Sequence, residues 1–350
     1  MSRKHNSKCF TSKNTDALKN DDNSSTKRDY YFDSYAHFGI HEQMLKDSVR
    51  TQAYRDAMFN NKHLFKHKIV LDVGCGTGIL SLFAAKAGAK KVYAVENSDI
   101  VDQAKSIVVK NCLSEVITVI RGKIEEVELP VDKVDIIISE WMGYCLYFES
   151  MLDSVIFARD KWLKDHGLIF PERVTLYLCA IEDSDYKEYK FGFWDDVHGF
   201  DMSRLKKLSL NEPIVKFVDK ERVASNSCLL REFNLGNGRK QDIPFLSEFQ
   251  LKLERDDYIN ALVSYFNVEF ALSYKKVELS TSPMSKHYTH WKQTVFYLKD
   301  DMTCKKDECI YGLFKLSPNQ SNRRDLDIDV QIDFEGELSN LHEFNKYKMR

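Results

Sequence analysis

The chain has 350 residues, of which 43% are hydrophobic and 30% are charged, proportions that are typical of a soluble globular protein. At about 150 residues per domain, this length predicts roughly two domains. The 51 basic and 53 acidic side chains leave a formal net charge of −2, which argues against a generally basic nucleic-acid-binding protein and leaves room for acidic patches that attract a cationic substrate.

The cysteines and the apolar runs narrow the class of protein further. Eight cysteines are scattered without any C-x-x-C pair, so we expect reduced thiols in an intracellular protein, with neither a zinc site nor a disulfide framework. The N-terminus lacks the apolar segment of a signal peptide, and the longest apolar runs are far too short to cross a bilayer. We therefore expect no metal and no membrane contact.

The N-terminal part divides into a polar tail and helices. Residues 1–29 are polar with few apolar groups, so we expect them to be disordered, because they cannot offset the entropy of ordering. From Tyr30 the pattern changes: Tyr31, Tyr35 and Phe38 fall at helical spacing, and residues 41–60 predict one longer helix.

Strands and helices then alternate. The strands are expected over residues 68–73, 91–96, 117–122 and 134–139, and helices over residues 78–87 and 100–111. Nearly all-apolar strands with helices between them predict a parallel, doubly wound sheet. We therefore expect a Rossmann-like domain, with the preceding helices, over residues 30–171.

After Pro171 the pattern becomes mainly β. Strand-like segments occupy residues 174–182, 265–274, 293–298 and 309–316, and residues 326–334 alternate cleanly between apolar and polar side chains. One-sided alternation predicts antiparallel strands that close on a core, so residues 172–350 are expected to form a β-barrel-like domain. Residues 184–213 interrupt it with aromatic and charged residues of helical character; they form either a helical subdomain inside the core or an excursion that packs on another subunit.

A glycine-rich turn ends the first expected strand. Asp72 stands two residues before Gly74, and the G-x-G-x-G spacing through Gly76 and Gly78 allows a tight turn and a close approach of backbone to ligand. A NAD-dependent dehydrogenase would instead want G-x-G-x-x-G. Glu96 closes the second strand, where an acid accepts hydrogen bonds from ribose hydroxyls. Together the two signals predict a nucleoside-type cofactor.

Three further glutamates follow later strands. Glu125 comes after the third, where it either reaches an adenine amino group or is a surface acid. Glu140 and Glu149 lie in an aromatic, methionine-rich loop after the fourth, beyond the carboxyl end of a strand, where ligands of open α/β sheets bind. Two carboxylates suit the planar guanidinium of arginine. Unrelated surface acids are the alternative, which the apolar setting disfavours because buried carboxylates need partners.

Four stretches carry a resemblance to the type I protein arginine N-methyltransferases. They read YYFDSYAHFGIHEQMLKDSVRTQAYR, VLDVGCGTGILSLFAAKAGAKKVYAVE, VDIIISEWMGYCLYFESML and YTHWKQTVFYL, and the resemblance runs from about Tyr30 to the end of the chain. A methyltransferase for small molecules would share the nucleotide half without needing the double-glutamate loop. A catalytically dead scaffold would be expected to have lost Glu140, Glu149 or Arg50, all of which are present.

The resemblance implies S-adenosylmethionine as the methyl donor, S-adenosylhomocysteine as its product, and no metal. It implies that Arg50 pairs with the cofactor carboxylate, Glu96 holds the ribose and Glu125 the adenine, and that a helix carrying Tyr31 folds over the cofactor. The residues that it assigns to the cofactor are Phe32, Tyr35, His41, Arg50, Asp72, Gly74, Gly76, Gly78, Glu96 and Glu125.

The resemblance also implies the catalytic and substrate-pocket residues. Glu140 and Glu149 grip the guanidinium, and His290 pairs with Asp47; either a glutamate or the His290–Asp47 pair receives the proton, and the sequence does not decide which. The residues that flank the substrate pocket are Met44, Tyr144, Met151 and Trp291. Met rather than Phe at position 44 implies asymmetric dimethylarginine, because Met yields space to a methylated nitrogen.

The expected partners follow from the same resemblance. They are arginine-containing proteins such as histone tails and Gly-Arg-rich RNA-binding proteins, and a second copy of the chain, since residues 184–213 resemble the arm through which these enzymes dimerise. No direct contact with nucleic acid is expected, and the resemblance implies residence in the nucleus and cytoplasm.

Overall fold

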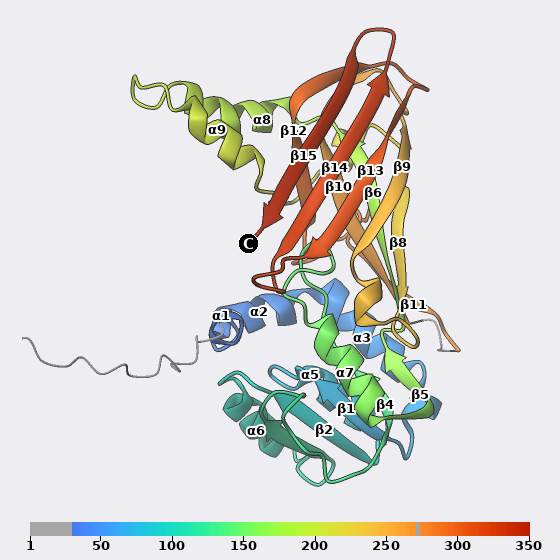
Figure 1. Ribbon diagram of the computed structural model, residues 1–350. Helices are drawn as coiled ribbons and strands as arrows, with labels where there is room; N and C mark the ends of the chain where they lie inside the picture. Colours follow the sequence, from blue (N-terminus) through green and yellow to red (C-terminus); the bar gives the residue numbers. More distant parts are fainter. Residues whose placement is uncertain (1–29, 271–273) are drawn as a thin grey trace, which may run out of the picture.

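The computed structural model describes residues 30–270 and 274–350, so the prediction of a disordered tail lies outside the described residues. Figure 1 shows a parallel sheet with helices in the lower half of the molecule and antiparallel sheets in the upper half. No helix within the described ranges is long and apolar enough to cross a bilayer.

The lower half is built around a five-stranded parallel sheet in the order β3-β2-β1-β4-β5. Its strands are β1 (Ile69–Val73), β2 (Lys91–Glu96), β3 (Ile117–Arg121), β4 (Val134–Ile138) and β5 (Leu163–Phe170). The winding reverses between β1 and β4, which opens a crevice at the carboxyl ends of these strands. The side chains of β1, β2 and β4 are almost all buried, as expected for a sheet covered on both faces.

Seven α-helices accompany this sheet within the described ranges: α1 (Tyr30–Ser34), α2 (Phe38–Lys46), α3 (Ser48–Phe59), α4 (Lys62–Phe65), α5 (Ile79–Lys86), α6 (Val101–Lys110) and α7 (Leu152–Trp162). The helices predicted over residues 78–87 and 100–111 and the four predicted strands of this half are confirmed to within one residue at each end. The strand β5 was not predicted, because exposed polar residues fill its first half.

The prediction of one helix over residues 41–60 is wrong. The helix is broken at Asp47, whose backbone is extended (φ −66°, ψ 93°) and whose side chain accepts a hydrogen bond of 2.9 Å from the backbone N–H of Arg50. Asp47 is therefore the N-cap of α3, a role for which a short carboxylate is favoured. The break separates α2, next to the cavity, from α3, which packs in the core.

The upper half contains two antiparallel sheets. One has the order β7-β12-β10-β6-β8 with β11 paired to β10, and the other has the order β15-β14-β13-β9. They share one core, in which the Phe296 ring lies 5.7 Å from that of Phe314 and 5.1 Å from that of Tyr347. The strands are β6 (Arg173–Ile181), β7 (Ile214–Lys216), β8 (Cys228–Asn234), β9 (Phe245–Lys252), β10 (Asp257–Phe270), β11 (Val277–Ser280), β12 (Gln293–Cys304), β13 (Cys309–Pro318), β14 (Leu326–Glu335) and β15 (Asn340–Met349).

The predicted alternation of residues 326–334 is confirmed, because β14 buries every second side chain. The predicted strands at 174–182 and 309–316 are confirmed as β6 and β13. The predictions at 265–274 and 293–298 found only parts of β10 and β12, which are much longer. Residues 271–273 of the first prediction lie outside the described residues.

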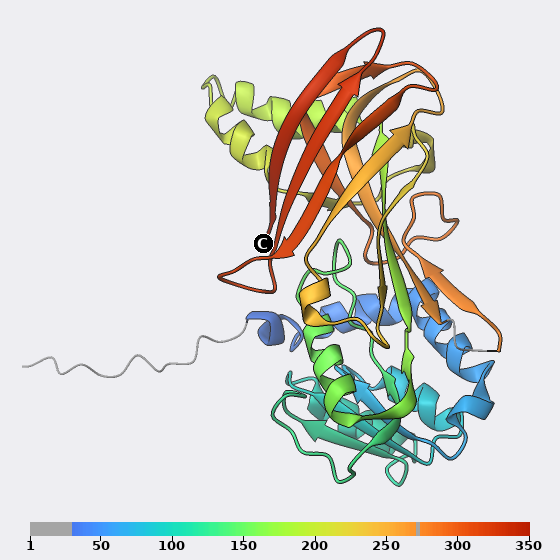
Figure 2. The same cartoon turned by 45° about the vertical axis from the view of Figure 1, so that its right-hand side comes forward.

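A helical segment leaves the upper half between β6 and β7. It comprises α8 (Ser184–Phe191), the 3₁₀ turn η1 (Gly192–Asp195) and α9 (Ser203–Leu210), which confirms its predicted helical character. Figures 1 and 2 show it projecting from the side of the sheets. Its outer part exposes Tyr189, Phe193, Phe200 and Leu208, whereas Phe191 at its base is buried 5.2 Å from the Tyr297 ring. Two further 3₁₀ turns, η2 (Lys220–Arg222) and η3 (Lys240–Asp242), lie in later loops.

Aromatic side chains join the two halves. Phe170, at the end of β5, lies 5.2 Å from the Phe65 ring and 6.2 Å from the ring of Phe270 on β10. Phe270 in turn meets Tyr54 of α3 at 4.9 Å. The crevice of the parallel sheet opens toward the upper half. The aromatic contacts of Phe170 and Phe270 therefore determine where the loops of the upper half meet that crevice.

The substitution Phe170→Ala should lower the free energy of unfolding by about 3–5 kcal/mol, because a fully buried ring would be replaced by a cavity. Chemical denaturation measures this loss. Phe344→Ala on the exposed side of β15 is the control and should cost no more than about 0.5 kcal/mol. Equal losses in the two variants would contradict the joining role of Phe170.

Candidate functional site

The glycine-rich turn between β1 and α5 forms the floor of a large cavity. A Cβ atom on Gly74 would come within 2.8 Å of Met151, and one on Gly76 within 3.3 Å of the His41 ring. Both glycines have positive φ values, of 71° and 53°. Only glycine fits this backbone without strain, so the turn can bring its peptide groups close to a ligand.

Glu96 stands at the end of β2 with both carboxylate oxygens held by backbone donors. Gly76 N–H donates to one oxygen and Ser98 N–H to the other, each at 2.8 Å. The side chain lines the cavity and is largely buried. Each oxygen keeps a second lone pair, so the fixed carboxylate can accept hydrogen bonds from two neighbouring hydroxyls of a ligand.

Asp72 lies beneath this turn, outside the cavity lining. It is fully buried and accepts a hydrogen bond of 2.6 Å from the Ser81 hydroxyl, which ties α5 to β1. Burial raises its pKa to about 7. Gly78 likewise lies outside the lining and serves as the N-cap of α5 with a φ of 88°. Roles of these two residues toward a cofactor stay predictions.

Glu140 and Arg50 form an ion pair in the wall of the cavity. Arg50 Nε donates to the Glu140 carboxylate at 2.9 Å, and each side chain is only 7% exposed. The pairing satisfies a buried charge of each sign. Arg50 also lines the cavity, and the other donors of its guanidinium allow a second acceptor such as a ligand carboxylate.

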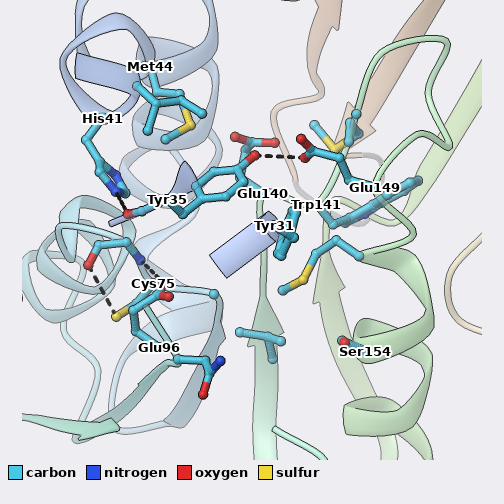
Figure 3. Close-up of a pocket in the computed structure, with 18 of the residues that line it drawn as sticks. Tyr31, Tyr35, His41, Met44, Cys75, Glu96, Glu140, Trp141, Glu149 and Ser154 are labelled. Carbon is cyan, nitrogen blue, oxygen red and sulfur yellow. Dashed lines mark hydrogen bonds between the residues drawn. The ribbon is translucent and has the colours of Figure 1, made fainter. Parts of the chain in front are cut away.

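Glu149 faces the same cavity from the far end of the loop. Tyr35 donates its hydroxyl to Glu149 at 2.9 Å, and Figure 3 shows this bond and the Glu140 carboxylate beside it. Burial raises the pKa of Glu149, the hydrogen bond from Tyr35 opposes the rise, and the like charge of Glu140 adds to it. A cation between the two carboxylates would remove that repulsion, which is the property required of a guanidinium site.

The predicted pair of His290 and Asp47 is present. The His290 ring Nδ1 lies 2.7 Å from Asp47 Oδ2, and the His290 backbone N–H donates to the same oxygen at 2.8 Å. Burial alone would raise the pKa of Asp47, but hydrogen bonds from the His290 ring and from two backbone N–H groups lower it. Trp291 next to it donates its Nε1–H to the carbonyl of Met142 at 2.7 Å, which fastens the β11–β12 loop to the double-glutamate loop.

The remaining predicted residues lie around the same space. His41 Nε2 lies 2.8 Å from the Tyr35 carbonyl, and Glu125 accepts a hydrogen bond of 2.6 Å from the Ser154 hydroxyl. Asp47 does not line the cavity itself and reaches it through His290. Predicted residues that do line the cavity also include Phe32, Met44, Tyr144, Met151 and Trp291.

Sequence reasoning missed several lining residues, among them Trp141 and Ser154. Ser154 lies on α7, and the only sign of its position is its hydrogen bond to Glu125. No local sequence pattern predicts that contact. The sequence analysis also missed Arg324. Its side chain donates a hydrogen bond to the backbone carbonyl of Glu149, which lies 175 positions earlier in the sequence. Within residues 30–270 and 274–350, no group of His, Cys, Asp or Glu side chains is arranged to hold a metal ion.

Two family models match the chain. Residues 57–153 match the ribosomal protein L11 methyltransferase (PrmA), and residues 172–337 match the arginine methyltransferase oligomerization subdomain. The chain is 55% identical over 325 residues to protein arginine N-methyltransferase 8-B of Danio rerio, a match that covers 93% of this chain and 77% of that protein. It is 54% identical over 327 residues to protein arginine N-methyltransferase 1 of Caenorhabditis elegans, covering 93% and 94%.

Solved structures are similar over nearly the same span. One is the Trypanosoma brucei PRMT1 enzyme–prozyme heterotetrameric complex with AdoHcy, with a TM-score of 0.88 at 46% identity, covering 91% of this chain and 100% of that chain. Another is Arabidopsis thaliana protein arginine methyltransferase 10 in a uniquely open conformation, with a TM-score of 0.84 at 30% identity and the same coverage.

The substitution Asp72→Asn should stabilise the fold increasingly as the pH rises. The carboxyl pKa is about 7 in the folded protein and 3.8 as its ordinary value, so the folded state holds an extra proton between these values and loses stability as the pH rises through them. The asparagine variant should therefore gain up to about 4 kcal/mol over wild type between pH 4 and pH 8, measured by chemical denaturation.

Asp135→Asn is the matched control with the opposite sign. Burial would raise the pKa of Asp135, but bonds from Ile69 N–H and Lys164, both at 2.8 Å, lower it. This variant should be less stable than wild type at neutral pH, and the deficit should shrink as the pH falls below 3.8. A pH-independent difference between Asp72→Asn and wild type would contradict the prediction.

Proposed function

The chain belongs to the protein arginine N-methyltransferase family, and we propose that its cavity methylates arginine side chains of proteins as a type I enzyme, with S-adenosylmethionine as donor. The observation that carries this proposal is that Glu140 and Glu149 line the same cavity as the glycine-rich turn and Glu96. The two carboxylates form one wall of the cavity, and the turn with Glu96 forms another. One wall suits a nucleoside and the other suits a guanidinium, as a transfer between the two requires.

The residues present fit the cofactor. The Gly74 and Gly76 backbone leaves room that a Cβ would fill, and Glu96 offers a fixed carboxylate for ribose hydroxyls. Arg50 would hold the carboxylate of the cofactor, and Glu125 the adenine amino group. Bound there, S-adenosylmethionine supplies an electrophilic methyl group on a sulfonium.

Glu140 and Glu149 would orient the substrate and raise its reactivity. A guanidinium is a poor nucleophile because its charge is delocalised. Two carboxylates on one edge of the group concentrate its positive charge away from the attacking nitrogen, and this stabilisation grows as the new bond forms. Fixing the nitrogen toward the donor supplies a further part of the rate.

The proton lost from the substrate nitrogen has two candidate acceptors. Glu149 has a raised pKa, which suits a carboxylate that takes up a proton. The His290–Asp47 pair is the alternative, and the aspartate would stabilise the imidazolium that then forms. The raised pKa favours Glu149, while Glu140 stays paired with Arg50.

We also propose that the chain works as a homodimer. The exposed apolar side chains of the segment α8 to α9 support this, as does the match of residues 172–337 to an oligomerization subdomain. Proposed substrates are histone tails and Gly-Arg-rich RNA-binding proteins. Residence in the nucleus and cytoplasm stays a prediction of the sequence.

The substitution Glu149→Gln should reduce methyl transfer to a Gly-Arg-rich peptide by about 10²–10³-fold, because removing one partner of a buried pair typically costs about 3–5 kcal/mol. The rate is measured by mass spectrometry of the peptide. Glu248→Gln makes the same change on the exposed outer side of β9 and should leave the rate unchanged. If Glu149→Gln folds normally and its activity is within tenfold of wild type, the proposal that Glu149 clamps the guanidinium is contradicted.

The wild-type product should be monomethylarginine followed by asymmetric dimethylarginine. Met44 on α2 lines the cavity, and its unbranched side chain can yield space to a methylated nitrogen. Met44→Phe should reduce the asymmetric product or stall the reaction after one methyl group, whereas the exposed Met284→Phe should not. Fragment-ion spectra distinguish the isomers, and symmetric dimethylarginine as the main wild-type product would overturn the product assignment.

A further inference from the structure

The loop that joins β13 to β14, residues 319–325, lies in the upper half of the molecule and contacts Glu149 and Tyr31, which line the cavity. It is braced internally, because the backbone N–H of Asn319 donates to the carbonyl of Asp325 at 2.9 Å and that of Asp325 donates to the carbonyl of Asn322 at 3.0 Å. Figures 1 and 2 show the ends of these strands next to α1 and α2. The loop is therefore a fixed point from which side chains can hold the residues that line the cavity.

Arg324 of this loop holds the backbone of Glu149 on both sides of the residue. The Glu149 N–H donates to the Arg324 carbonyl at 2.7 Å, and Arg324 Nη1 donates to the Glu149 carbonyl at 2.8 Å. Glu149 and the next residue, Ser150, both have left-handed backbones, with φ values of 73° and 58°. Side chains other than glycine rarely adopt this conformation, so it persists only where surrounding contacts impose it.

The same guanidinium also holds α1. It lies 3.9 Å from the centroid of the Tyr31 ring and 5.2 Å from that of Phe32, which are cation–π distances. From the same helix end, Tyr35 donates its hydroxyl to the Glu149 carboxylate. Arg324, α1 and Glu149 therefore form a closed set of contacts among three segments that are remote in sequence.

We infer that Arg324 is a positioning residue for methyl transfer, which holds the carboxylate of Glu149 in the cavity and joins its placement to the seating of α1. The inference rests on the proposed role of Glu149 as one arm of the guanidinium clamp. An arginine suits this position, because one guanidinium donates to the Glu149 carbonyl while it also lies over the Tyr31 ring. A lysine can supply the charge without this geometry.

The charge of Arg324 acts on Glu149 as well. The titratable and charged groups around the Glu149 carboxylate are Tyr31, Tyr35, Glu140, Tyr144 and Arg324. Burial raises the pKa of Glu149 and Glu140 adds to the rise, while the hydrogen bond from Tyr35 and the positive charge of Arg324 oppose it. Removing that charge should raise the pKa further, so that Glu149 is deprotonated only at higher pH.

The experiment compares Arg324→Met, Arg324→Lys and the neighbouring control Arg323→Met in the full chain. Arg323 belongs to the same loop, but its exposed side chain pairs with Asp153 at the start of α7. Arg324→Met should lower kcat by about 10–100-fold, with a smaller change in KM for the peptide, because the carboxylate is displaced from its place on the substrate. Arg323→Met should behave as wild type.

The pH profile and hydrogen exchange separate positioning from a general structural role. The acidic limb of kcat should move to higher pH in Arg324→Met and stay in place in Arg324→Lys, which keeps the charge. Amide exchange of residues 30–46 should slow on adding S-adenosylhomocysteine in wild type and Arg323→Met, and slow less in both Arg324 variants.

The inference would be overturned if Arg324→Met had the kcat, the acidic pH limb and the amide exchange of the wild type. It would also be overturned if Arg323→Met lost as much kcat as Arg324→Met. Full activity of Glu149→Gln beside a defective Arg324→Met would also overturn it, since Arg324 would then act on some other group. If the wild-type protein methylated no arginine peptide, the proposed function would fail, and hydrogen exchange would still decide whether Arg324 seats α1.

Discussion

Two like-charged carboxylates that face one buried cavity are the constraint on which the rest of the site depends. Neither can stay ionised there without partners, because desolvation and mutual repulsion both disfavour the charge. Glu140 is paired with Arg50, while Glu149 receives a hydrogen bond from Tyr35 and lies near the charge of Arg324. The partners are arranged so that the carboxylates remain poised for a cation, which itself would complete the neutralisation.

The fold supplies these partners from segments that are far apart in sequence. The break at Asp47 ends α2 beside the cavity and starts α3, whose first turn carries Arg50. The Asp47 carboxylate caps α3 and also lies within hydrogen-bond distance of the His290 ring, which comes from the β11–β12 loop. Trp291 is bonded to the carbonyl of Met142 in the double-glutamate loop. The antiparallel half therefore contributes His290 and Trp291 directly to the cavity, on the side where the substrate is proposed to bind.

Local patterns were sufficient for much of the parallel half and for the cofactor wall. Apolar strands such as β2 and helices rich in Ala and Leu such as α5 depend on neighbours a few residues away, so the sequence reveals them. The helix over residues 41–60 was predicted without its break. The helical spacing of apolar residues continues through Asp47, and this spacing does not reveal that Asp47 caps a new helix. Strand β15 exposes most of its first half, and its apolar alternation is too weak to identify. Arg324 lies outside any motif, since its role arises only when residues 149 and 324 meet.

The two walls of the cavity differ in how they are built, and this difference has a physical consequence. Glu96 is oriented by backbone N–H groups of Gly76 and Ser98, within one strand–helix–strand unit, so the nucleoside wall depends on the parallel half alone. The proposed substrate wall depends on Tyr35 just after α1 and on side chains brought by the β11–β12 loop and by the β13–β14 loop. A change in the seating of the upper half therefore disturbs the grip on a guanidinium before it disturbs the hold on ribose. The ribose contact of Glu96 can thus form as it would in an ordinary parallel-sheet domain, whereas the grip on a guanidinium requires both halves of the chain together.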